Sequence, residues 1–408
     1  MKYLPTFIFL VFTFLSCKTT KEVYHVSLAE KANSLAQKNI IVDGHIDLPY
    51  RLKIKNFRLE KEYIGIPVQT DEGDFDFVRA RSGGLDAPFM SIYIPARHQK
   101  EGGAKALADS LINMIEYIAS ENPTKFMIAK TPSDVEKAFS KGKVALPMGM
   151  ENGAGIEDDL SNIKYFDKRG ISYITLTHSK DNLICDSSYD TTHTWNGLSE
   201  YGELVVHEMN RVGIMVDISH VSDSAYYDVL EIVDLPVIAS HSSARRFVPG
   251  FERNMSDEMI QALGKNGGVI MVNFGSTFLD GNIRKERDKR REELMEILDK
   301  EGVSGNSDEG KIIITAFEKN NPNIYSDVKK VADHIDLIVE LAGIDHVGFG
   351  SDYDGVGDSL PTGLKDVSDY PNLIEELLRR GYSEEDISKI CYKNLFRVWN
   401  EVEEYAKK

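Results

Sequence analysis

The 408-residue sequence has little cysteine and no excess of positive charge. Both features limit the classes of protein to which it can belong. It holds three cysteines, of which Cys185 and Cys391 could form at most one bridge, so no disulfide framework is present. Cys391 lies in an apolar-periodic helical pattern, where a buried free thiol is the expected state. The formal net charge of −17 argues against nucleic acid and anionic membrane surfaces as partners, because both require a basic patch. A small molecule or a metal ion is the expected partner.

The N-terminal apolar run is too short for a membrane-spanning helix. It covers about a dozen residues between Lys2 and Ser16-Cys17, which is typical of a signal peptide. A small residue followed by cysteine resembles a bacterial lipoprotein cleavage site, although Phe14 stands where leucine is usual. We therefore predict a signal peptide over residues 1–16, a lipid on Cys17, and an exported protein anchored to a bacterial membrane, facing the periplasm or the cell surface. An ordinary signal peptide is the alternative.

The chain also lacks solenoid-type repeats and, after about residue 30, any Pro/Ser-rich linker. Instead, a short apolar run followed by a polar cluster and a longer helical pattern occurs eight times. The runs are "NIIVDGHID", "APFMSIYIPAR", "KVALPMGMENG", "SYITLTHSKD", "GIMVDISHVS", "LPVIASHSSA", "GGVIMVNFGS" and "HVGFGSDYDG". Such runs alternating with amphipathic segments predict parallel strands covered by helices. Eight units predict an α/β fold, the (β/α)8 TIM-like barrel, with a doubly wound sheet as the alternative.

Two further segments lie outside this pattern. Residues 280–325 are highly charged, with only "KIIIT" to suggest a strand, and predict a mainly helical insertion between strands 7 and 8. Near the C-terminus, Ser383 is followed by three acidic residues and an apolar stripe, which predicts a capped terminal helix packed on the barrel. We expect residues 17–37 to form a tether and leading helix, and residues 38–408 to form the barrel.

Polar side chains able to bind a metal follow most of the predicted strands. In an extended chain residues i and i+2 point to the same side, so His45 and Asp47 could reach one point together. A strand and turn with both side chains in solvent is the alternative for that motif alone. Later strands are followed by Glu151, His178, His220, His241, Asp352 and Asp354. In a barrel the C-terminal ends of the strands form a single mouth, where such enzymes carry out their chemistry.

This convergence predicts a metal centre. A single histidine at a strand end is usually structural, but four histidines and several carboxylates at one mouth need a compensating charge. A divalent cation supplies it, and imidazole and carboxylate are the usual zinc ligands outside all-thiolate sites. Five ligands exceed the need of one open zinc site, so two metals bridged by Glu151, midway in strand order, fit better. Two such cations can hold a hydroxide and polarise a carbonyl, which predicts metal-assisted hydrolysis.

The motifs together resemble a known family. They are "DGHIDLP", "GMENG", "TLTHSKDN", "GLSEYGELVVHEMNRVGIMVDISHVS", "PVIASHSSAR", "RNMSDEMI", "GGVIMVNF" and "GFGSDYDG". From about residue 38 to the C-terminus the sequence is similar to the membrane dipeptidase (renal dipeptidase) family of zinc peptidases, with the motifs in the family's order. The resemblance implies that His45 and Asp47 hold one zinc ion, that His220 and His241 hold the other, and that Glu151 bridges both. It implies a binuclear zinc dipeptidase that attacks with a hydroxide bridging the metals.

The resemblance also implies roles in substrate binding and catalysis. His178 would contact the substrate near the scissile carbonyl and its tetrahedral intermediate, Arg253 would bind the substrate carboxylate, and Asp352 would transfer the proton. Arginine suits a carboxylate because its planar fork donates two parallel hydrogen bonds. Without the resemblance, Arg253 would be interpreted as an exposed loop residue. Asp354, which precedes a glycine, is the better candidate for capping a turn.

Three features depart from the mammalian members of that family. The insertion at 280–325 is longer than expected, the cysteines do not match the family's disulfides, and the anchor is an N-terminal lipid rather than a C-terminal glycolipid. These departures leave the metal centre intact but leave the substrate open. The family accepts dipeptides with a C-terminal D-residue and some β-lactams, so peptidoglycan fragments and scavenged dipeptides are both candidates. The oligomeric state is also open, a homodimer included.

Two rival functions follow from the same residues. One is another metal-dependent amidohydrolase that acts on N-acyl amino acids or lactones, for which a carboxylated lysine in place of Glu151 would be expected. The other is a non-catalytic surface binding lipoprotein, which would be expected to have lost Asp352 or a metal ligand. The sequence retains all of these residues, so dipeptide hydrolysis is the predicted function.

Overall fold

The computed structural model describes residues 1–2, 27–54 and 68–408, and it contains a closed barrel of eight parallel strands. The order around the barrel is β1-β10-β9-β8-β7-β6-β5-β2, so the predicted (β/α)8 barrel is confirmed. The predicted lipidation site, Cys17, lies outside the described residues. The barrel strands are β1 (Ile41–Ile46), β2 (Leu85–Tyr93), β5 (Met148–Glu151), β6 (Ile171–Thr175), β7 (Met215–Asp217), β8 (Ile238–Ser242), β9 (Val269–Val272) and β10 (Val347–Phe349).

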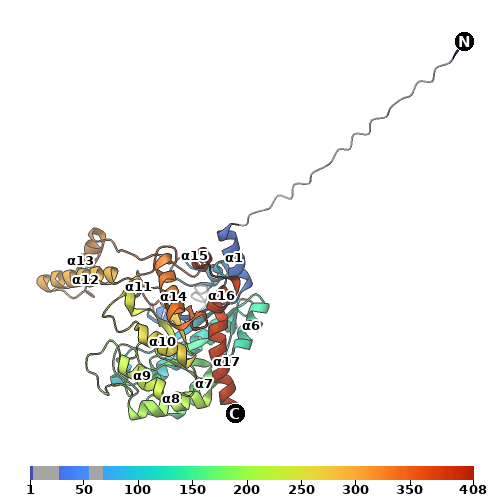
Figure 1. Cartoon of the computed structure of the whole chain (residues 1–408). Helices are drawn as coiled ribbons and strands as arrows, with labels where there is room; N and C mark the ends of the chain where they lie inside the picture. The colour runs from blue at the N-terminus through green and yellow to red at the C-terminus, as the bar shows by residue number, and fades with distance from the viewer. Residues whose placement is uncertain (3–26, 55–67) are drawn as a thin grey trace.

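Helices surround the barrel and connect its strands (Figure 1). Their ends follow the local sequence: Ser199 caps the first turn of α8, and Gly213 ends that helix in the left-handed conformation, with φ of 94°. The connecting helices are α2 (Leu48–Ile54), α3 (Phe77–Gly83), α4 (His98–Glu101), α5 (Ala104–Glu121), α6 (Pro132–Ser140), α7 (Ser161–Arg169), α8 (Glu200–Val212), α9 (Asp223–Ile232), α10 (Asp257–Asn266), α14 (Val328–Ala342) and α15 (Tyr370–Arg379). The helix α1 (Leu28–Lys38) precedes the first strand.

The interior of the barrel is filled by side chains rather than open. Phe89, Tyr173 and Met271 belong to one buried cluster, which Phe396 and Trp399 of α17 (Asn394–Ala406) join. The rings of Phe89 and Trp399 lie 5.1 Å apart between centroids. The terminal helix therefore packs against the contents of the barrel, while the C-terminal ends of the strands remain available for a site.

The third predicted strand is in fact two strands. The run "KVALPMGMENG" forms β4 (Val144–Leu146) and β5, and β4 pairs with β3 (Phe126–Ile128) in a separate two-stranded sheet. Pro147 separates β4 from β5 because it has no backbone N–H to donate to a sheet. The predicted terminal helix is also divided, since a π-helical turn at Lys389–Lys393 lies between α16 (Glu384–Ser388) and α17. Ser383 and Asp386 form the capping box that begins α16.

The charged insertion is helical, as predicted. Residues 280–325 contain α12 (Gly281–Glu301) and α13 (Asp308–Asn320), which follow the short helix α11 (Ser276–Leu279) and project from one side of the barrel (Figure 1). The strand-like "KIIIT" lies inside α13. Cys185 and Cys391 are both buried free thiols, so the bridge that the sequence left open does not form. In the part of the chain that the structure describes, none of the helices combines the length and apolar character that crossing a membrane requires.

Candidate metal centre and active site

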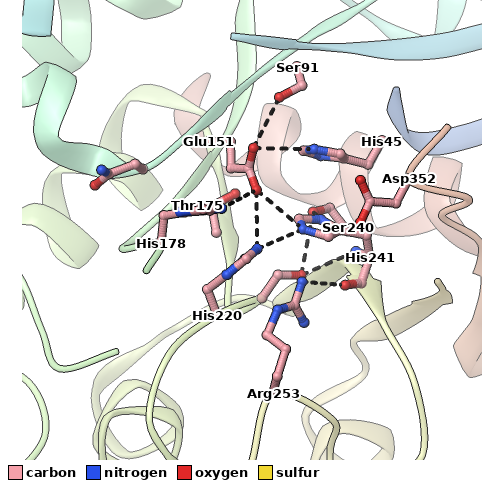
Figure 2. A network of polar contacts seen from close by, with 12 residues as sticks. His45, Ser91, Glu151, Thr175, His178, His220, Ser240, His241, Arg253 and Asp352 are labelled. Atoms are coloured by element: carbon pink, nitrogen blue, oxygen red, sulfur yellow. Dashed lines mark hydrogen bonds and ion pairs between the residues drawn. The ribbon is translucent and has the colours of Figure 1, made fainter. Parts of the chain in front are cut away.

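The predicted ligands meet at the mouth of the barrel. His45 is the penultimate residue of β1, and Asp47 directly follows that strand. Glu151 ends β5, His241 is the penultimate residue of β8, and His220 follows β7. Figure 2 shows the side chains of His45, Glu151, His220 and His241 pointing toward one another. The structure thus brings together residues that lie up to 196 positions apart, as 241 − 45 gives.

Glu151 occupies the centre of this group. Its Oε1 lies 3.1 Å from His220 Nε2, 3.4 Å from His241 Nε2 and 3.5 Å from His178 Nε2, and its Oε2 lies 3.4 Å from His45 Nε2. The carboxylate is 4% exposed. Oε1 therefore faces three imidazoles and Oε2 faces a fourth, and a carboxylate whose two oxygens face different ligands can bridge two cations.

His45 is held in the tautomer that a metal ligand requires. The Tyr173 hydroxyl donates to Gly44 O at 2.9 Å, so at 3.0 Å it accepts the proton of His45 Nδ1. The lone pair of His45 Nε2 then points into the site, where this buried nitrogen has no hydrogen-bond partner among the described residues. Gly149 makes room for the tyrosine, because a Cβ at that position would lie 2.0 Å from its ring.

His241 is held in the same way by two residues of neighbouring strands. Ser240 Oγ donates to Asp217 Oδ2 at 2.6 Å, so it accepts from His241 Nδ1 at 2.8 Å. The lone pair of His241 Nε2 consequently faces His220 Nε2 at 2.9 Å. Two ring nitrogens at that distance need a proton or a cation between them. The donor set therefore fits a divalent metal ion, and the buried unpartnered Oδ1 of Asp47 adds a further ligand atom.

The electrostatics of the site also favour bound positive charge. Burial opposes a charge on His45, yet Tyr173, Glu151 and Asp47 raise its pKa well above the ordinary value. Burial lowers the pKa of His220 and His241 well below that value, and the charge of Arg253 adds to the effect on both. Burial also raises the pKa of Glu151, but the surrounding histidines outweigh it and hold that pKa well below its usual range. The neutral imidazoles of His220 and His241, beside an ionised carboxylate, are ready to bind a cation.

Asp352 lies beside the ligands of the first predicted metal. His45, Asp47 and Asp352 offer three ligand atoms within 4.8 Å of one another, and His45 Nε2 is 3.6 Å from Asp47 Oδ2. Asn273 Nδ2 donates to Asp352 Oδ2 at 2.8 Å, which fixes the direction of the carboxylate. Gly355 lets the two aspartates approach, since a Cβ there would lie 2.0 Å from Asp352 Oδ1 and 2.2 Å from Asp47 Oδ2.

Strained backbone occurs at two of these residues. His220 has φ of 71° and Asp352 has φ of 62°, in the left-handed region that residues other than glycine seldom adopt. Each residue follows a short strand, β7 or β10, by three positions. Strain of this kind persists where the surrounding structure holds it, and it is common at functional sites.

The same mouth opens into a cavity of about 660 Å³. Its wall includes Tyr93, Tyr189 and Phe278 together with His178 and Asp352. The cavity is large enough for a small peptide and is bounded by both apolar rings and ionisable groups, as small-molecule sites commonly are.

Arg253 lies behind the ligands and is 2% exposed, not the exposed loop residue that the sequence alone would suggest. Its Nη2 donates to His241 O at 2.7 Å and its Nη1 donates to Ser242 Oγ at 2.6 Å. Its buried Nε has no hydrogen-bond partner, and no carboxylate pairs with this guanidinium among the described residues. The charge is therefore placed to accept an anionic group of a ligand.

The sequence did not identify the residues that support the ligands. Asp43 accepts from His45 N and from Ser351 N, at 2.9 and 3.1 Å, and so joins β1 to the loop that carries Asp352. Asp217 accepts from Ser240 N at 2.8 Å and joins β7 to β8. Both aspartates do carry a signal, because each interrupts an apolar run, in "IIVDGH" and "IMVDIS". A carboxylate in such a run requires buried hydrogen bonds.

We predict that Tyr173→Phe lowers the affinity for zinc about 10- to 100-fold, because His45 loses the group that fixes its tautomer. Competition with a fluorescent chelator would measure the affinity. Tyr226→Phe is the matched control, since this buried hydroxyl donates to Met259 O at 2.7 Å, away from the metal ligands. Equal zinc affinities in the two variants would contradict the role of Tyr173 in holding His45 as a metal ligand.

A family model matches this sequence, and solved structures share its fold. The sequence model described as "Membrane dipeptidase (Peptidase family M19)" matches residues 29–408. The solved structure of the probable dipeptidase PvdM from Pseudomonas aeruginosa is 26% identical, covers 93% of this chain and 99% of its own, and superposes with a TM-score of 0.77. A metallopeptidase from Rhodobacter sphaeroides, solved with a phosphinate mimic of the dipeptide L-Ala-D-Ala, is 23% identical, covers 89% and 99%, and has a TM-score of 0.72.

Proposed function

The chain belongs to the membrane dipeptidase family, peptidase family M19, and is a metallo-dipeptidase, and on that basis we propose that it cleaves dipeptides with two zinc ions. The observation that carries the proposal is the placement of Glu151, whose Oε1 faces three imidazoles and whose Oε2 faces that of His45, all at 3.1–3.5 Å. In this proposal His45 and Asp47 hold one ion, His220 and His241 hold the other, and Glu151 bridges them. All of the donors are nitrogen and oxygen atoms, which suits zinc.

When bound, the two ions supply hydroxide at neutral pH and polarise the scissile carbonyl. The protein's own residues supply positioning and proton transfer. Arg253 binds the C-terminal carboxylate of the dipeptide, and its unpartnered Nε supports this role. His178 lies on the cavity wall, 3.5 Å from Glu151 Oε1, and donates to the developing negative charge at the scissile carbonyl. Asp352 takes a proton at its carboxylate and delivers it to the leaving amine.

The substrates in this proposal include dipeptides with a C-terminal D-residue. The related metallopeptidase from Rhodobacter sphaeroides was solved with a mimic of L-Ala-D-Ala, which supports the extension to this chain. A carboxylate held by Arg253 fixes the end of the substrate whichever configuration the last residue has.

We predict that the zinc-loaded protein cleaves L-Ala-L-Ala and L-Ala-D-Ala but largely refuses tripeptides and C-terminally amidated dipeptides. If Arg253 holds the C-terminal carboxylate while the metals hold the scissile carbonyl, only one residue lies between these two points in a dipeptide, and an amide cannot replace the carboxylate that neutralises a buried guanidinium. Release of free amino acids would measure this, and a chelator should abolish it until zinc is restored. Equal rates on a dipeptide and its amide would rule out the role of Arg253, whereas no cleavage of any dipeptide would rule out the function.

We also propose that the protein is exported and anchored to a bacterial membrane through a lipid on Cys17, with residues 1–16 removed. The proposal rests on the sequence at the end of the N-terminal apolar run. Metabolic labelling with a tagged fatty acid should mark the wild type but not Cys17→Ser. Equal labelling of the two proteins would overturn it.

A further inference from the structure

An arginine–aspartate pair lines the active-site cavity on the side away from Arg253. Arg51 Nη1 donates to Asp354 Oδ1 at 2.7 Å, and both residues form part of the cavity wall. Arg51 belongs to α2, directly after β1, and Asp354 follows β10. These two strands are neighbours in the barrel, whereas Arg253 binds the backbone of β8, which lies beyond β9.

The pair is fixed from behind. Asp354 Oδ1 also accepts from Asp74 N at 2.8 Å, and Arg51 Nη1 also donates to Glu72 O at 3.3 Å. Gly73 allows the guanidinium to pass, because a Cβ at that position would overlap Arg51 Nη1 at 0.9 Å. Neither side chain can turn away without losing several contacts, so the pair presents a rigid surface to the cavity.

Two buried polar atoms of this pair remain unpartnered. Arg51 Nη2, a donor, and Asp354 Oδ2, an acceptor, have no hydrogen-bond partner in the described part of the chain. The side chains are 13% and 1% exposed, so water satisfies them poorly. Arg51 and Asp354 line both the active-site cavity and an adjoining cavity of about 380 Å³. Orphaned buried polar atoms are rare in folded proteins, and a donor and an acceptor on one ion pair in a cavity wall suit a ligand group that both donates and accepts.

The direction of the dipeptide decides which part of it meets the pair. This step rests on the proposed function, in which Arg253 holds the C-terminal carboxylate and the metal ligands hold the scissile carbonyl. The N-terminal residue then lies on the opposite side of the metal ligands from Arg253. Asp47 and Arg51 follow β1, and Asp352 and Asp354 follow the neighbouring strand β10, so all four line the cavity from this part of the barrel.

We propose that the Arg51–Asp354 pair is a specificity subsite for dipeptides whose N-terminal residue carries a carboxamide side chain, such as glutamine or asparagine. The carboxamide oxygen accepts from Arg51 Nη2, and its NH2 group donates to Asp354 Oδ2. A carboxylate of the same shape fits less well, because Asp354 already neutralises Arg51 and the second carboxylate oxygen would face Asp354 Oδ2. An alkyl side chain leaves both atoms unpartnered.

The test compares L-Gln-L-Ala with its isostere L-Glu-L-Ala on the zinc-loaded protein. We expect kcat/KM for the glutamine substrate to be higher by about tenfold or more, as for hydrogen bonds to charged groups. Calorimetry with the phosphinate mimics of the two dipeptides should show the same ratio of Kd values, and this readout does not depend on turnover.

Arg51→Lys provides the decisive variant, because lysine retains a charge beside Asp354 but loses the second donor of the fork. We expect the Gln/Glu ratio to fall to within about threefold of unity. Arg81→Lys is the matched control: Arg81 Nη1 binds Asp86 Oδ1 at the same 2.7 Å, and neither residue lines the cavity, so the ratio should stay at the wild-type value.

Several outcomes would overturn the inference. They are equal or reversed preference in the wild type, an unchanged ratio in Arg51→Lys, and failure of both mimics to bind. If no dipeptide is cleaved, not even L-Ala-L-Ala, the proposed function fails, and the calorimetric ratio alone decides the role of the pair.

Discussion

Replacing Asp352 with asparagine is expected to lower kcat by about 10²-fold or more while the protein keeps both metals and its affinity for dipeptides. A hydroxide that attacks an amide leaves a nitrogen that must be protonated before the C–N bond breaks. Asp352 is buried at the mouth, with Oδ2 fixed by Asn273 and Oδ1 close to Asp47. Asparagine has the same shape but cannot carry a proton between the water and the leaving amine.

The environment of Asp352 suits a group that gains and loses a proton. Burial, followed by the charges of Asp47 and Glu151, raises its pKa to about 8, against the opposing effect of His45. Cations bound to those two neighbours would offset part of the repulsion and move the pKa back toward neutrality. A general acid or base works best when its pKa lies near the working pH.

Asp354→Asn is the comparison for this prediction. Its carboxylate accepts from Arg51 and from Asp74 N, which makes it a fixed part of the cavity wall rather than a proton carrier. We therefore expect kcat to fall less on L-Ala-L-Ala than it does in Asp352→Asn. Stopped assays of kcat, with metal content measured on the same samples, separate the two effects. Normal turnover by Asp352→Asn with both metals present would move the proton transfer to another group, and His178 would be tested next.

The barrel could be predicted because its strands are buried on both faces. Parallel strands covered by helices appear as continuous apolar runs, and eight of these runs correspond to the eight strands that close the sheet. The predicted ligands then followed from one physical rule, that the C-terminal ends of such strands share a mouth. His220 and Asp352 could be placed there although their strands, β7 and β10, have only three residues each.

The residues that support the ligands make contacts with partners far away in the sequence. The sequence alone does not show which residues form these pairs. Tyr173 supports His45 across 128 positions, and Asp43 binds Ser351 N across 308. A tyrosine in an apolar strand gives no sign of which histidine it contacts. The pairing of β4 with β3 could not be predicted for a similar reason. Pro147 could have marked a bend within one strand as well as a boundary between strands of two sheets.

The buried Arg253 illustrates the same limit at the substrate site. An arginine in "GFERNMSD" is surrounded by polar residues in the sequence, which favours an exposed loop. Its burial follows from the backbone carbonyl of His241 and the hydroxyl of Ser242, which become available only when β8 reaches the mouth. Its burial could not be predicted from composition, and its role in binding a carboxylate stays a prediction from the family resemblance.

Glu151→Gln is expected to abolish stable binding of at least one of the two metals, and with it nearly all activity. An amide of the same size is neutral, so it cannot offset two dications, and only one of its two polar atoms can act as a ligand. Removing one partner of a buried charge pair typically costs about 3–5 kcal/mol, which corresponds to about 10²–10⁴-fold in affinity.

Metal analysis after dialysis, together with a zinc titration against a competing chelator, measures this loss directly. Glu376→Gln is the control for removing a buried carboxylate. Glu376 lies on α15, is 5% exposed, accepts from Arg379 and Arg380, and is not part of the cavity wall. That variant should keep two zinc equivalents and normal turnover even if its melting temperature falls. If Glu151→Gln also keeps two equivalents with unchanged affinity, the carboxylate does not bridge the metals, and the four imidazoles around it must hold them by another arrangement.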